Sequence, residues 1–147
     1  MIQLGVLGST KGTDLQAILD AIKSGDLNAD VSVVLSNRKN AYILKRAENH
    51  SVPALFISHK GKPREEFDSE MTVVLKEHNV DLVLLIGFMR ILSAGFCQKW
   101  RNRLLNVHPS LLPKYACGMD TNVHKEVLKN GETETGCTIH FVTDEVD

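Results

Sequence analysis

The sequence has few cysteines, few aromatic side chains and no strong excess of either charge. Its three cysteines, Cys97, Cys117 and Cys137, are widely spaced and odd in number, which predicts neither a disulfide framework nor a Cys-x-x-Cys centre. The six histidines lack the spacing of a zinc site. The 17 basic and 18 acidic side chains are spread along the chain, which argues against a nucleic-acid-binding face. We therefore expect a small-molecule partner, no metal, no nucleic acid and a reducing cytoplasmic setting.

Long hydrophobic runs are also missing. The longest, residues 82–86, is far shorter than the roughly 20 residues of a membrane span, and the N-terminus lacks the basic and apolar regions of a signal peptide. No membrane association is expected, and the protein should be a monomer or homodimer. The 147 residues, 43% of them hydrophobic, suffice for one domain but are few for a complete α/β enzyme. We expect residues 1–147 to form that single domain.

Short apolar runs alternate with amphipathic segments along the whole chain. The predicted strands are 2–7, 31–35, 54–57, 81–86, 104–108 and 137–142, and the predicted helices between them centre on 15–22, 41–47, 67–75, 94–100 and 123–128. The run 81–86 is nearly continuous in apolar residues, as expected of a central strand covered on both faces. Strands and helices that alternate at this spacing predict a Rossmann-like α/β fold: a mostly parallel twisted sheet with helices on both faces.

A glycine-containing loop, residues 8–12, joins the first predicted strand to the first predicted helix. Thr13 or Asp14 could cap that helix and Gly25 could end it. The free N–H groups of a first helical turn favour an anion. The glycine spacing matches neither a dinucleotide fingerprint nor a Walker loop, so a plain tight turn is an equal alternative.

Two polar side chains stand at the end of the strand 104–108. The period of two puts Asn106 and His108 on one face, and Pro109 ends the strand. Ligands of open α/β sheets bind beyond the carboxyl ends of the strands, which favours a functional role for this pair. The alternative is that both side chains only satisfy loop backbone groups. Three charged residues lie in predicted loops. Arg90 is predicted with equal weight as a ligand contact or as a surface charge, and Lys60 and Lys62 are predicted as solvated charges rather than as a binding patch.

Four motifs then support a family resemblance. Residues 106–113, Asn-Val-His-Pro-Ser-Leu-Leu-Pro, and 87–93, Gly-Phe-Met-Arg-Ile-Leu-Ser, resemble enzymes that transfer a formyl group from 10-formyltetrahydrofolate. The stretches 9–17 and 140–147 narrow the resemblance to phosphoribosylglycinamide formyltransferases, the glycinamide ribonucleotide transformylases of purine synthesis. The motifs occur in the family's order and span essentially the whole chain.

The resemblance implies a role for each matching residue. The catalytic residues would be Asn106, His108 and Asp147. The folate would contact Met89, Arg90, Ile91, Leu92, Val142, Thr143 and Asp144. The substrate glycinamide ribonucleotide would contact Lys11, Gly12, Thr13, Asp14, Gly87, Val107 and Pro109. In chemical terms, Asn106 and a protonated His108 would stabilise the negative formyl oxygen, and Asp147 would help to move the proton.

The sequence also departs from the family pattern. Thr10 stands where the family has glycine, Asp14 where it has asparagine, and Cys117 where it has glycine. The family continues beyond Asp147 with a strand and a long helix, so we expect the domain to be incomplete at its C-terminus. A methionyl-tRNA formyltransferase and a non-catalytic folate- or nucleotide-binding module are the alternatives.

Overall fold

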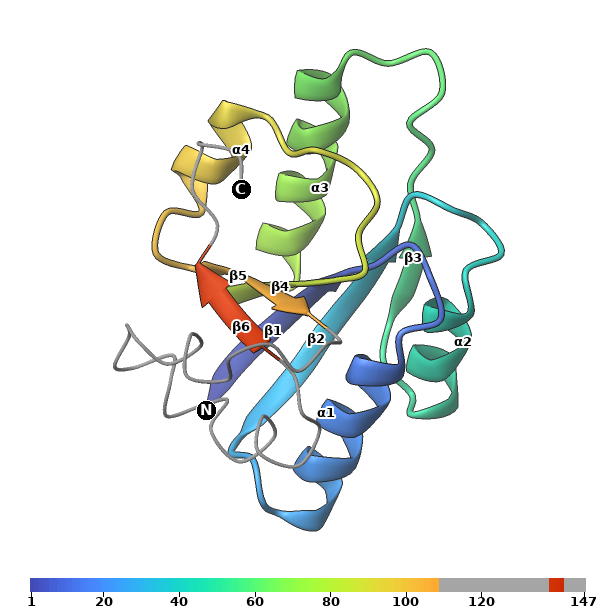
Figure 1. Cartoon of the computed structure of the whole chain (residues 1–147), viewed down its shortest axis with the longest axis vertical. Helices are drawn as coiled ribbons and strands as arrows, with labels where there is room; N and C mark the ends of the chain where they lie inside the picture. Colours follow the sequence, from blue (N-terminus) through green and yellow to red (C-terminus); the bar gives the residue numbers. More distant parts are fainter. Residues whose placement is uncertain (109–137, 142–147) are drawn as a thin grey trace.

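The apolar runs of the sequence form the strands of one twisted sheet. The computed structural model describes residues 1–108 and 138–141. Its strands are β1 (Ile2–Leu7), β2 (Ala29–Ser36), β3 (Ala54–Phe56), β4 (Leu82–Ile86), β5 (Leu104–His108) and β6 (Thr138–Phe141). They lie in the order β3-β2-β1-β4-β5-β6, in which β1 to β5 pair in parallel and β6 is antiparallel to β5 (Figure 1). The predicted Rossmann-like, mostly parallel sheet is confirmed.

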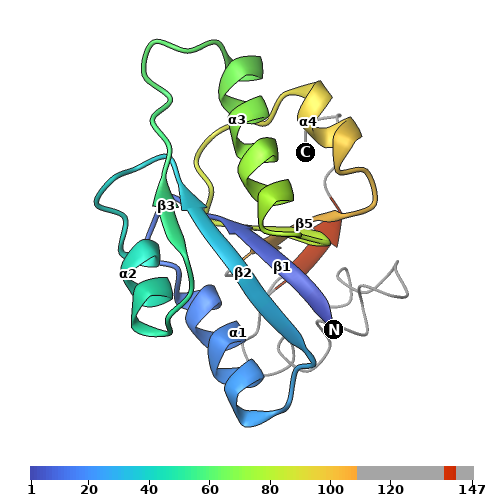
Figure 2. The same cartoon turned by 180° about the vertical axis from the view of Figure 1, so that it is seen from behind.

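Helices cover both faces of this sheet, as predicted. They are α1 (Thr13–Ser24), α2 (Tyr42–Asn49), α3 (Arg64–Glu77) and α4 (Ala94–Lys99). The pair α1 and α2 packs on one face, and α3 and α4 pack on the other (Figures 1 and 2). Neighbouring strand residues point to opposite faces, so Val6 belongs to the α1–α2 core and Leu7 to the α3–α4 core. No helix in the described part of the chain is long and apolar enough to cross a membrane.

The central position predicted for β4 is confirmed. The strand lies between β1 and β5, and every one of its residues is at most 8% exposed. Both of its faces are covered, which explains the absence of polar alternation in its sequence. On the α3–α4 side, the buried Trp100 fills the space below α3 and its indole N–H donates to Thr72 Oγ1 at 3.3 Å. This packing fixes the short α4 and therefore the start of β5.

The first helix begins differently from the prediction. Neither Thr13 nor Asp14 caps it: Gly12 is the N-cap, with φ 71°, and no side chain donates or accepts a capping hydrogen bond. A Cβ on Gly12 would lie 2.3 Å from Cγ1 of Ile43, so the close packing of α2 as well as the left-handed backbone requires glycine here. At the other end Gly25, with φ 89°, ends the helix as predicted.

Candidate active site

The loops that follow β1, β2 and β4 meet at the carboxyl edge of the sheet. Backbone hydrogen bonds join them: Gly8 N–H donates to Leu35 O at 3.0 Å, and Ser9 N–H donates to Gly87 O at 3.1 Å. The N–H of Ile43, in α2, donates to Thr10 O at 3.0 Å. The loop after β1 is therefore held from both sides, at the place where open α/β sheets bind their ligands.

A buried hydroxyl adds side-chain bonds to this junction. Ser9 is 2% exposed, and its Oγ donates to Asn37 Oδ1 at 2.5 Å while accepting from the N–H of Met89 at 2.9 Å. Asn37 is also buried, at 6% exposure. Our sequence analysis missed both residues. The available signal was the position of each polar residue, just after the end of a buried strand. A polar side chain that is buried at such a position needs a hydrogen-bond partner.

Asn106 lies near the carboxyl end of β5, as predicted. The strand pairs with β4, so that Asn106 lies beside Leu85 and its neighbour Val107 beside Ile86. Leu105 and Val107 belong to the α1–α2 core, whereas Leu104 belongs to the α3–α4 core, so the period of two turns Asn106 toward the α3–α4 face. The side chain is half-buried, and its carboxamide has no hydrogen-bond partner among the described residues.

The other predicted catalytic residues are described only in part. His108 is the last residue of β5 and pairs with Thr138 of β6, which confirms that it follows Asn106 in the same strand. Asp147 lies outside the described residues, as do Pro109, Val142, Thr143 and Asp144. The catalytic roles of all three residues stay predictions.

The predicted folate loop after β4 exposes apolar side chains. Met89 is 60% exposed and Ile91 63% exposed, whereas Leu92 packs against the α3–α4 core. The Arg90 guanidinium lies over the Phe67 ring, 4.7 Å from its centroid, and the buried Nε of Arg90 has no hydrogen-bond partner among the described residues. Arg90 also forms no ion pair with any of them, and its assignment as a ligand contact or a surface charge stays open.

The predicted substrate loop is tightly packed. Thr10 does not have a positive φ, so the family's glycine is not needed there for backbone reasons. Gly87 does have one, φ 61°, and a Cβ added to it would lie 2.5 Å from Thr10 Oγ1. The Lys11 carbonyl accepts from Arg46 Nε at 2.6 Å. The side chain of Val107 is 2% exposed within the core, so only its backbone is available to a ligand.

Thr13 and Asp14 occupy the first turn of α1, beyond the Gly12 cap. The Thr13 side chain is exposed and that of Asp14 is half-buried. Their backbone N–H groups belong to the end of the helix that favours an anion. This is the position that the predicted phosphate contacts require, although their role stays a prediction.

A cavity of about 790 Å³ lies beside this loop, at the carboxyl ends of β1, β2 and β3. Its lining comes from the three loops that follow these strands, from the end of β3 and from the start of α2: Ser9, Thr10, Lys11, Asn37, Arg38, Lys39, Asn40, Ala41, Tyr42, Phe56, Ser58, His59 and Lys60. Asn106 is not part of it. The sequence analysis assigned only Lys11 of this lining to a site.

Comparison with known proteins identifies the family. The formyl transferase family matches residues 2–147. The phosphoribosylglycinamide formyltransferase of Haemophilus influenzae is 41% identical over 148 residues, which cover all of this chain and 68% of that protein. The human trifunctional purine biosynthetic protein adenosine-3 is 44% identical, and this chain spans only 14% of its length. The solved structure of glycinamide ribonucleotide transformylase 1 from Symbiobacterium toebii has a TM-score of 0.79 at 41% identity, with 100% of this chain and 68% of that one covered. The resemblance found in the sequence is therefore confirmed, and the chain belongs to the formyl transferase family.

Proposed function

We propose that the protein transfers the formyl group of 10-formyltetrahydrofolate to the amine of glycinamide ribonucleotide, a step of purine synthesis. The relatives named as phosphoribosylglycinamide formyltransferases match nearly the entire sequence. The structural observation that carries the proposal is the half-buried carboxamide of Asn106 at the carboxyl end of β5, which has no hydrogen-bond partner within residues 1–108 and 138–141. A polar donor that this part of the fold does not engage could serve a reacting group.

The reaction needs the groups that the motif supplies. The substrate amine attacks the formyl carbon, negative charge develops on the formyl oxygen, and the tetrahydrofolate nitrogen leaves with the proton that the amine gives up. The Asn106 amide N–H would donate to that oxygen, and a protonated His108, two residues further on, would donate a charge-assisted bond. Asp147 would favour the protonated imidazole and assist the proton transfer.

The loop after β4 is suited to the folate. Met89 and Ile91 offer exposed apolar side chains to a flat ring system, beside the backbone of residues 90–92. The guanidinium of Arg90, which has no carboxylate partner in the described part of the chain, is available to an acidic group of the folate. Val142, Thr143 and Asp144 would complete this side of the site.

The loop after β1 is suited to the substrate phosphate. Lys11 and Gly12 precede the first turn of α1, whose free N–H groups favour an anion. Gly87 O accepts from the N–H of Ser9 in this loop, and Val107 pairs with Ile86, the residue before Gly87. Gly87 and the backbone of Val107 would contact the ribosyl glycinamide, together with Pro109.

The test is Asn106→Ala, assayed by the absorbance change that accompanies loss of the formyl group from the folate. Loss of one oxyanion donor should lower kcat by about 10²–10³ with little change in either KM. Asn49→Ala, which truncates an exposed asparagine in α2, is the matched control and should retain full turnover.

Three results would contradict the proposal. Full turnover by Asn106→Ala would remove Asn106 from the chemistry. Formylation of methionyl-tRNA but not of glycinamide ribonucleotide would indicate a sister enzyme. Folate binding without turnover of either substrate would indicate a binding module.

A further inference from the structure

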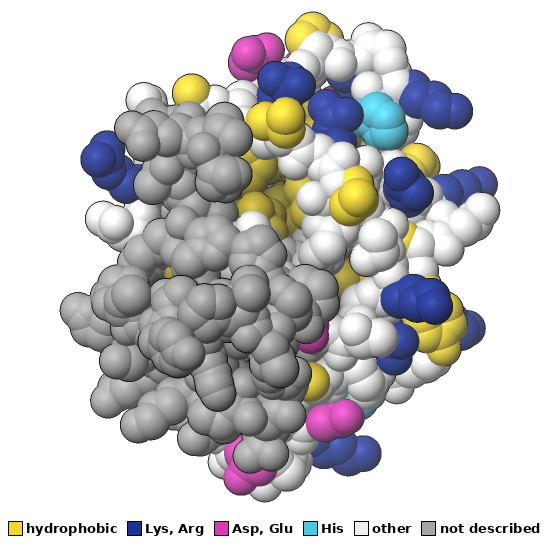
Figure 3. Space-filling model, in the orientation of Figure 1, with side chains coloured by type: hydrophobic (Ala, Val, Ile, Leu, Met, Phe, Trp, Pro, Cys, Tyr) yellow, Lys and Arg dark blue, Asp and Glu magenta, His cyan; other side chains and the backbone are white. Residues whose placement is uncertain are grey.

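Four positively charged side chains line the cavity at the ends of β1, β2 and β3: Lys11, Arg38, Lys39 and Lys60. Its described lining includes no aspartate or glutamate. None of these four side chains forms an ion pair with a described residue. In Figure 3, dark blue lysine and arginine side chains gather along the right-hand edge, where no magenta carboxylate lies among them. Unneutralised cations around a concave surface attract a ligand of high negative charge.

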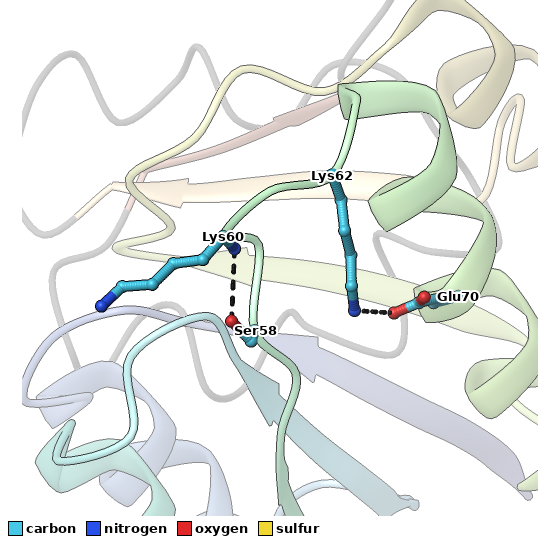
Figure 4. A network of polar contacts seen from close by, with 4 residues as sticks. All are labelled: Ser58, Lys60, Lys62 and Glu70. Atoms are coloured by element: carbon cyan, nitrogen blue, oxygen red, sulfur yellow. Dashed lines mark hydrogen bonds and ion pairs between the residues drawn. The ribbon is translucent and has the colours of Figure 1, made fainter.

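Lys60 and Lys62 lie two residues apart but differ in their partners. Lys62 Nζ pairs with Glu70 Oε1 of α3 at 2.7 Å. Lys60, two residues earlier, points away from α3, and its backbone N–H donates to Ser58 Oγ at 3.2 Å (Figure 4). Gly61 between them has φ 73°, which turns the chain so that the two side chains diverge. Lys62 is thus neutralised by Glu70, whereas Lys60 lines the cavity without an ion-pair partner among the described residues.

An exposed aromatic ring lies in the same cavity. Phe56, the last residue of β3, is 42% exposed, and its ring contacts no other ring or cation among the described residues. Tyr42 is 50% exposed, but the Arg46 guanidinium already lies 4.8 Å from its ring centroid. Phe56 is therefore the ring that is available to stack on a flat ligand group.

We propose that this cavity is a second small-molecule site, which binds a nucleoside polyphosphate. The base would stack on Phe56, and the phosphates would be held by Arg38, Lys39 and Lys60. The volume of about 790 Å³ falls within the usual range for such ligands. Its floor is rigid, because the Ser9 and Asn37 side chains that line it are buried and bonded to each other.

The proposed site is distinct from that of the formyl transfer. It shares Thr10 and Lys11 with the predicted phosphate loop, but its other three cations come from the loops after β2 and β3, and its aromatic ring is the last residue of β3. Glycinamide ribonucleotide carries one phosphate and no base, so it would use neither Phe56 nor the full set of cations. The proposal can therefore be tested by binding alone, whatever reaction the protein catalyses.

The experiment is calorimetric titration of the whole chain with ADP at low salt, in parallel with inorganic tripolyphosphate. Arg38→Gln with Lys39→Gln should weaken ADP binding by about tenfold or more, because two of the three proposed phosphate partners are removed. Phe56→Leu should weaken ADP binding by about fivefold or more but leave tripolyphosphate binding unchanged. Lys45→Gln, an exposed α2 lysine outside the cavity, is the control for loss of charge and should change binding by less than about twofold.

Several results would overturn the proposal. One is the absence of ADP binding at millimolar concentration. Another is equal loss of affinity per charge in Lys45→Gln and in the double variant, which would indicate attraction by net charge only. A third is unchanged ADP affinity in Phe56→Leu, which would exclude the base from the cavity. Thermal unfolding of each variant should be followed in parallel, and it should be unchanged because the four substituted side chains are exposed.

Discussion

Replacing Ser9 by alanine should both destabilise the protein and loosen the folate loop. Ser9 is 2% exposed, and its hydroxyl makes two bonds, with Asn37 Oδ1 and with the N–H of Met89. Each bond contributes about 0.5–1.5 kcal/mol net, and a buried partner left unsatisfied costs about 1–3 kcal/mol. We expect a loss of about 2–4 kcal/mol in the free energy of unfolding. For a chain of this length that corresponds to a decrease in Tm of roughly 5–12 °C.

Urea denaturation of Ser9→Ala beside Ser24→Ala measures this effect. Ser24 also makes two hydrogen bonds, with Ala21 O at 3.1 Å and Asp26 Oδ2 at 3.0 Å, but it is exposed. Its removal should therefore cost less than about 0.5 kcal/mol. In the formyl-transfer assay, Ser9→Ala should raise KM for the folate more than KM for the nucleotide, because Met89 belongs to the predicted folate loop. Equal stability of the two variants, or a larger increase in KM for the nucleotide than in KM for the folate, would refute the reasoning.

Three further predictions concern the neighbouring loops. Gly87→Ala should lower the free energy of unfolding by about 1–3 kcal/mol, measured by thermal unfolding, because φ is 61° and the new Cβ would lie 2.5 Å from Thr10 Oγ1. Adding Thr10→Ala should recover only the loss caused by the contact with Thr10. Full recovery of stability would show that the positive φ costs nothing. Lys62→Gln should cost less than about 1 kcal/mol, because its pair with Glu70 is partly exposed, and a larger loss in urea denaturation would contradict this ranking. Lys11→Ala should raise KM for the nucleotide more than it lowers kcat, because a phosphate contact is present in ground and transition states alike; steady-state kinetics with an unchanged KM would exclude Lys11 from the site.

The fold could be predicted because its signals are local. The continuous apolar run of β4 indicated a strand covered on both faces, and Gly25 indicated the end of α1. The alternation of side chains likewise predicted the strand 104–108 and placed Asn106 and His108 on one of its faces. The Gly12 cap was not visible, because the reason for it is the side chain of Ile43, which belongs to another helix. Antiparallel β6 was also not specified by the alternation of strands and helices.

The parts of the site that the sequence did not predict depend on contacts between distant segments. Ser9 and Asn37 are 28 residues apart, and only the parallel register of β1 and β2 brings the ends of these strands together. The stacking of Arg90 on Phe67 likewise joins the loop after β4 to α3. A single sequence gives the residue type and its position along a strand, but not the partner across the sheet. The assignment of the loop residues therefore depended on resemblance, whereas the position of Asn106 did not.

The Ser9 hydroxyl connects three loops of the site. It joins the loop after β1 to the loops after β2 and β4, which are the predicted phosphate loop, the floor of the basic cavity and the predicted folate loop. Among the described residues, Asn106 is outside this network, and β5 is joined to it through the pairing with β4. The predicted ligand loops and the predicted oxyanion donor are thus supported by different sets of bonds in this part of the chain. This separation is the reason to expect Ser9→Ala to change KM, whereas Asn106→Ala changes kcat.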